Sequence, residues 1–61
     1  MVLRKVNAGV FDVFVGNGWM NWVRVRTRHT QFGTKVHILN SNIHISQPQL
    51  EEIESRFNTK Q

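Results

Sequence analysis

The chain contains no cysteine, so neither a disulfide framework nor a thiolate metal site can form. It has a single proline, Pro48, and no apolar run long enough for a signal peptide or a membrane span. With 61 residues, it is close to the smallest size at which one core keeps a domain folded. We therefore expect one small domain over residues 1–61, intracellular and cytoplasmic, that makes no membrane contact and is stabilised by a compact core, by self-association, or by both.

Acidic residues are scarce before the C-terminal segment. Residues 1–46 hold six Lys and Arg residues and a single acid, Asp12, for a net charge of +5. Residues 47–61 hold two basic and three acidic residues, for a net charge of −1, so the whole chain carries +4. This asymmetry suits a partner that presents phosphates or carboxylates.

Most of the chain alternates between apolar and polar residues, as antiparallel strands do. The pattern predicts a β-meander over residues 10–45, with strands at 10–15, 19–30, 35–39 and 42–45. Turn residues stand at 16–18 and 31–34, and residues 40–42 form either a turn or a bulge, because the apolar positions change parity there. Residues 1–8 either add an edge strand or stay loose.

The end of the chain changes to a helical period. Leu50, Ile53 and Phe57 have the spacing of one apolar helix stripe. The preceding stretch SQPQ (46–49) fits a capping box with a proline in the first turn. These signals predict a helix over residues 47–58. The expected fold is mainly β (α+β): an antiparallel meander of three to four strands, or a small partly open barrel, with one C-terminal helix.

The first hairpin has a preferred register. A three-residue loop, with Gly18 left-handed, pairs Val15 with Trp19 and Phe11 with Val23, and it keeps apolar and basic side chains on separate faces. The face expected to meet the helix then carries Phe11, Val13, Val15, Trp19, Val23 and Val25.

The opposite face combines aromatic and basic side chains. The residues expected to serve as a binding site are Phe14, Trp22, Arg24, Arg26, Arg28, Lys35 and His37. Guanidinium and ammonium groups neutralise phosphates, and aromatic rings offer a surface on which bases stack. The sequence therefore predicts a small, basic, non-enzymatic protein that binds nucleic acid, single-stranded DNA or RNA with low sequence selectivity.

Two other interpretations of this face stay open. Alternating arginines are also common on the solvated side of a half-buried sheet. The same aromatic and arginine surface also suits a protein-binding modulator, an inhibitor or adaptor that engages an acidic or nucleic-acid-binding protein. An apolar patch of Phe14, Met20, Trp22 and Leu39, or an open sheet edge, further predicts a homodimer.

The sequence gives little support for other chemistry. His29, His37 and His44 lack cysteine partners and the short spacing of zinc ligands, so we expect no metal site. No serine stands in a nucleophile motif, and the glutamates at 51, 52 and 54 fit a solvated helix face. We therefore expect no enzymatic activity and no cofactor.

Overall fold

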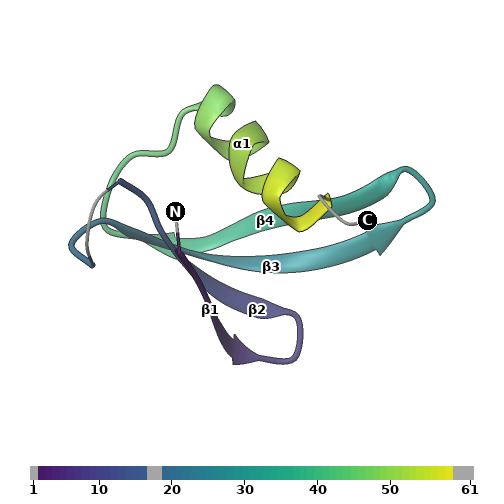
Figure 1. Cartoon of the computed structure of the whole chain (residues 1–61), viewed down its shortest axis with the longest axis horizontal. Helices are drawn as coiled ribbons and strands as arrows, with labels where there is room; N and C mark the ends of the chain where they lie inside the picture. The colour runs from purple at the N-terminus through teal and green to yellow at the C-terminus, as the bar shows by residue number, and fades with distance from the viewer. Residues whose placement is uncertain (1, 17–18, 59–61) are drawn as a thin grey trace.

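The computed structural model describes residues 2–16 and 19–58, which form one open antiparallel sheet with a helix packed on one side (Figure 1). The elements are β1 (Val2–Asn7), β2 (Val10–Phe14), β3 (Trp22–Thr30), β4 (Gly33–Ser41) and α1 (Gln47–Asn58). The four strands lie in the order β1-β2-β3-β4, so each pairs with its neighbour in the sequence. The predicted meander with one C-terminal helix is confirmed, and the sheet is open rather than closed into a barrel. None of the described residues belongs to a helix that is long and apolar enough to cross a membrane.

The N-terminal segment forms an edge strand, which decides between the two alternatives for residues 1–8. β1 returns into β2 through a short turn in which Gly9 has a φ of +75°, a conformation that residues with a side chain rarely adopt. The pairing shifts between Lys5 and Asn7, so Val6 is the extra residue of a β-bulge.

The register between β2 and β3 differs from the predicted one by two residues. Phe11 pairs with Val25 rather than with Val23, which instead lies opposite Val13. The three-residue loop was therefore the wrong choice. Because the shift is an even number of residues, the strands keep the predicted side chains on the predicted faces.

The connection between β2 and β3 is longer than predicted. Its innermost backbone bond runs from the Val15 N–H to the Asn21 carbonyl, at 3.0 Å. Gly16 has a φ of +77°, whereas the predicted left-handed Gly18 lies outside the described residues. Trp19 falls within this loop instead of pairing with Val15, so its predicted place on the helix-facing side of the sheet is wrong.

β4 is longer than the predicted strand at 35–39 and contains a bulge. Arg24 pairs with Asn40, but the next residue, Val25, pairs with Ile38, which leaves Leu39 without a partner position in β3. This extra residue accounts for the change of apolar parity that the sequence places at 40–42.

The predicted fourth strand at 42–45 does not form. β4 ends at Ser41, and an irregular connection leads to α1. At the start of this connection, the Ser41 hydroxyl donates a hydrogen bond to the Ile43 carbonyl at 2.7 Å. Ile43 and Ile45 still pack against the core, so their alternation reflects burial rather than strand pairing.

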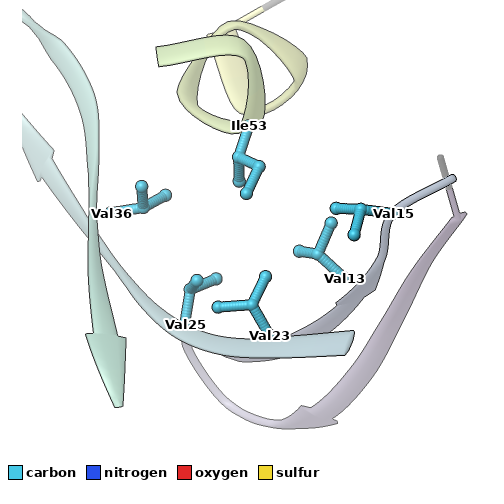
Figure 2. Close-up of a cluster of buried hydrophobic side chains, with 6 residues drawn as sticks. All are labelled: Val13, Val15, Val23, Val25, Val36 and Ile53. Atoms are coloured by element: carbon cyan, nitrogen blue, oxygen red, sulfur yellow. The ribbon is translucent and has the colours of Figure 1, made fainter. Parts of the chain in front are cut away.

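The core lies between α1 and the sheet, as Figure 2 shows. Ile53 points from the helix into a group of valines on β2, β3, β4 and the residue after β2, namely Val13, Val23, Val25, Val36 and Val15. Phe57 extends the contact, and its ring meets that of Phe11 edge-on at 5.0 Å between centroids. The helix therefore packs where the spacing of its apolar residues predicts.

Candidate nucleic-acid interface

The outer face is the side of the sheet that is turned away from α1. Since Val13, Val23 and Val25 point into the core, the residues between them in each strand point outward. Their cross-strand partners share that face. The outer face comprises Val2, Arg4, Val10, Asp12, Phe14, Trp22, Arg24, Arg26, Arg28, Lys35, His37 and Asn40.

An ion pair occupies the middle of the outer face. The Arg24 side chain donates from Nε to Asp12 Oδ1 at 2.7 Å and from Nη2 to Oδ2 at 3.1 Å. Asp12 is buried, and on its other side Arg4 is its cross-strand partner in β1. The hydrogen bond from Arg24 lowers the pKa of Asp12 most, with further lowering by the charges of Arg24 and Arg4, and burial opposes the shift. The same pair raises the pKa of Arg24.

This pair changes what Arg24 can do. Its fork-shaped guanidinium is already bound at two positions by a carboxylate, the geometry with which it would otherwise hold a phosphate. The Arg24 guanidinium is therefore less available to an anion than its place in the sequence predicts. Asp12 also cancels one positive charge at the centre of the face.

The basic cluster lies beyond this pair, on the long β3–β4 hairpin, and comprises Arg26, Arg28, Lys35 and His37. Arg26 pairs with His37 across the strands, and Arg28 pairs with Lys35. All of these side chains are exposed. The Asp12–Arg24 contact is the single ion pair in the part of the chain that the structure describes, so the cluster has no acidic partner there. Arg28 and Lys35 are like charges directly opposite each other, and an anion that binds between them would relieve their repulsion.

The aromatic end of the outer face is built differently from the sequence prediction. Phe14 is buried, and Trp19 from the β2–β3 loop lies against it at 4.6 Å between ring centroids and 68° between ring planes. Trp19 itself is 64% exposed, and Trp22 is half-buried. Phe14 is therefore a support for Trp19, and the rings open to a ligand are those of Trp19 and Trp22.

Asn42 holds this end of the face together. Its backbone N–H donates to the Trp22 carbonyl at 3.2 Å, and its side-chain Oδ1 accepts from the Trp22 N–H at 2.8 Å. Its Nδ2 also donates to the carbonyl of Met20 at 2.6 Å. One asparagine therefore fastens the last residues of the β2–β3 loop to the start of the connection that leads to α1.

The histidines do not gather into a metal site. His37 lies in the basic cluster, while His29 is on the helix-facing side of the sheet, where its Nδ1 is 3.1 Å from the Thr34 hydroxyl. His44 is exposed in the connection to α1. Among residues 2–16 and 19–58, no group of three His, Asp or Glu side chains lies close enough to hold a metal ion.

All of the candidate residues from the sequence lie on one face, but they do not act alike. Arg26, Arg28, Lys35 and His37 form one exposed group, Arg24 is bound to Asp12, and Phe14 is covered. The exposed position of Trp19 and the Asp12–Arg24 ion pair were not predicted from the sequence. The signal for the ion pair is that Asp12 is the single acid in residues 1–46 and has the outward parity of the arginines. The position of Trp19 depends on a loop whose length the sequence does not determine. Comparison of the chain with protein-family models, curated proteins and solved structures gave no match.

Proposed function

We propose that this protein binds single-stranded nucleic acid through the outer face, without catalysis and with low sequence selectivity. The observation that carries the proposal is the basic cluster: Arg26, Arg28, Lys35 and His37 are exposed and adjacent on two paired strands. Concentrated positive charge without acidic partners favours phosphates, and each phosphate contact releases a counterion.

The spacing of the cluster supports an extended strand of nucleic acid as the ligand. Residues two apart on a β-strand rise by about 6.6 Å, which is close to the repeat of an extended single-stranded backbone. Arg26 and Arg28 therefore match successive phosphates along β3, and Lys35 and His37 offer a second row beside them. Trp19 and Trp22 lie toward the other end of the face, where exposed rings would stack on bases.

The first test separates this surface from general electrostatic attraction. Fluorescence anisotropy of a labelled mixed-sequence oligonucleotide is measured over a salt series for the wild type, Arg28→Ala and Arg56→Ala. Both variants lose one positive charge, but Arg56 is exposed on α1, on the other side of the sheet. We expect Arg28→Ala to reduce the slope of log K against log salt by about 0.7, the value for one phosphate contact with a single strand. Arg56→Ala should leave the slope near that of the wild type.

The second test concerns stacking. Replacing Trp19 with Ala should weaken binding by about 1–3 kcal/mol if a base lies on the indole. Met20, the next residue, is 80% exposed and provides the control, because Met20→Ala removes apolar surface without removing a ring. Equal effects of the two substitutions would argue against stacking. An absence of binding at low salt, in anisotropy and in an independent assay, would end the nucleic-acid proposal.

A second candidate function rests on the pair of large exposed side chains in the β2–β3 loop. Trp19 and Met20 are residue types typical of protein interfaces, and Trp19 contacts Phe14 on the same face of the sheet as the arginines. The protein would then act as a modulator that occupies an acidic or nucleic-acid-binding surface of a larger protein. A pull-down treated with nuclease distinguishes the two: a stoichiometric protein partner that survives the treatment favours the modulator, and loss of all bound material favours nucleic acid.

A further inference from the structure

The two edges of the sheet differ in whether other described residues bond to their backbone groups. At the β4 edge, Asn58 of α1 receives the Thr34 N–H on Oδ1 at 2.7 Å and donates from Nδ2 to the Thr34 carbonyl at 2.9 Å. Glu54, one helical turn earlier, accepts the Val36 N–H at 3.2 Å. These side chains take the places that another strand would fill, so this part of the β4 edge is closed to strand addition.

Within residues 2–16 and 19–58, no side chain covers the β1 edge in this way. The bonds from Val15 N–H to Asn21 and from Thr27 N–H to Gly9 identify the residues of β2 that bond toward β3. Hydrogen bonding alternates along an antiparallel pair, so Asp12 and Phe14 bond toward β1 instead. The backbone N–H and C=O groups of their β1 partners, Arg4 and Val2, therefore point toward β2. The backbone groups of the alternate residues, Leu3 and Lys5, point away from the sheet.

The side chains of β1 are also unusually open for a strand. Val2, Leu3 and Val6 are 47%, 40% and 37% exposed, and none of them belongs to the buried core. Exposed apolar residues on an uncovered edge strand favour pairing with another strand.

We propose that two copies of this chain pair through β1, antiparallel, about a two-fold axis at Arg4. Val2 and Val6 stand two residues before and two residues after Arg4, so this axis places a valine opposite a valine. In this register, Leu3 of each copy lies opposite Lys5 of the other, and these are the residues whose free backbone groups can exchange both N–H···O bonds. Val2 lies opposite Val6 of the second copy, so each of these exposed valines gains an apolar neighbour.

The side chains of β1 are suited to pairing with a second copy of the same strand. The alkyl part of Lys5 covers Leu3 of the other copy while its ammonium group stays in water. The two Arg4 side chains meet at the axis, each beside its own Asp12 carboxylate, whose pKa Arg4 helps to lower. Pairing would join the two outer faces into one continuous surface. The inference depends on the sheet edge alone and does not rest on the proposed function.

Because the two Arg4 side chains lie opposite each other, the stability of the dimer should depend on salt concentration. Like charges opposite each other weaken strand pairing, and salt screens them. We therefore expect association to strengthen as salt rises, whereas nucleic-acid binding weakens. Arg4→Ser should tighten the dimer by about two- to fivefold, since it removes the repulsion between directly opposed like charges.

The central experiment is sedimentation equilibrium of the wild type, Leu3→Ala and Leu3→Pro at two salt concentrations. Proline removes the outward N–H of Leu3 without breaking a bond inside the sheet, so Leu3→Pro should be monomeric. Leu3→Ala keeps the N–H and should still form dimers, although more weakly. Circular dichroism of Leu3→Pro checks that its sheet is intact.

A second measurement does not depend on any substitution. Amide hydrogen exchange of Leu3 and Lys5 in the wild type should slow as the protein concentration rises, while the exchange of Trp19 in the β2–β3 loop should stay constant. A protein that is monomeric at millimolar concentration would overturn the proposal, as would a dimer in which these two amides exchange at an unchanged rate. An acidic extended peptide that protects Leu3 and Lys5 on a monomer would also overturn it, and would assign the edge to a different partner.

Discussion

The contact between α1 and the sheet depends on Ile53. Its side chain is fully buried, and it is the one helix residue in the described chain that is. Ile53→Ala should destabilise the fold by about 2–5 kcal/mol, and by the upper part of that range if the cavity persists. We expect it to persist because the surrounding side chains are short, branched valines on hydrogen-bonded strands. Ile53→Val removes a single methylene and should cost about 0.5–1.5 kcal/mol.

These values are large for so small a domain. A chain of 61 residues has a free energy of unfolding of roughly 3–9 kcal/mol, from 0.05–0.15 kcal/mol per residue. Ile53→Ala should therefore lose a large part of this free energy and unfold at a much lower urea concentration, whereas Ile53→Val should show only a small decrease in urea midpoint. Urea unfolding followed by far-ultraviolet circular dichroism measures both, with an unchanged m-value expected for Ile53→Val.

A matched control lies next to this residue on the same helix. Glu52 is exposed, and Glu52→Ala should change the free energy of unfolding by no more than about 0.5 kcal/mol. If Ile53→Ala unfolds at the same urea concentration as Glu52→Ala, the helix does not stabilise the sheet and the described core is incorrect.

Three further predictions follow from other contacts. Phe57→Ala loses the edge-on contact with Phe11, and since Phe57 is only half-buried the cost should lie near or below the lower end of the about 3–5 kcal/mol found for buried phenylalanines; calorimetry with an unchanged melting temperature would contradict this. Because the pKa of Asp12 is lowered in the folded state, its stabilising contribution is present above its unfolded pKa of about 3.9 and is lost as the pH falls through its folded pKa. Asp12→Asn should therefore be less stable than the wild type at pH 7, and its urea midpoint should decrease less than that of the wild type as the pH is lowered into this range. Gly33→Ala forces a side chain into a φ of +116° and places its Cβ 2.9 Å from Asn58 Oδ1, so it should cost about 1–3 kcal/mol and speed exchange of the Thr34 amide; unchanged exchange would show that Asn58 does not seal that edge.

The helix and the faces of the sheet could be predicted because each follows from a local period. Leu50, Ile53 and Phe57 repeat with the helix, and the predicted range 47–58 is the observed one. In the strands, the alternation of side chains places Val13 and Val23 toward the core in any register of the right parity. That constraint fixes the face but leaves shifts of two residues undetermined, and the actual hairpin register differs by that amount.

The remaining details depend on contacts between distant residues. The irregular path of residues 42–45 still buries Ile43 and Ile45, so its alternation resembles that of a strand. The hydrogen bonds between Arg24 and Asp12 form because these two residues lie opposite each other on β3 and β2, and the predicted register differs from this one by two residues. Trp19 reaches Phe14 only because the loop is longer than a tight turn. The last two features give Arg24 and Phe14, both candidate site residues, roles that differ from those their positions in the sequence indicate.

The closure of the β4 edge by Glu54 and Asn58 also imposes an order on folding. α1 follows β4 in the chain, so during synthesis all four strands leave the ribosome before the residues that protect their last edge. For that interval, the growing sheet has two unprotected sides and is exposed to pairing with neighbouring chains. Docking of the helix ends this interval at one side. The rate at which α1 docks therefore sets how long the β4 edge stays open to pairing with another chain.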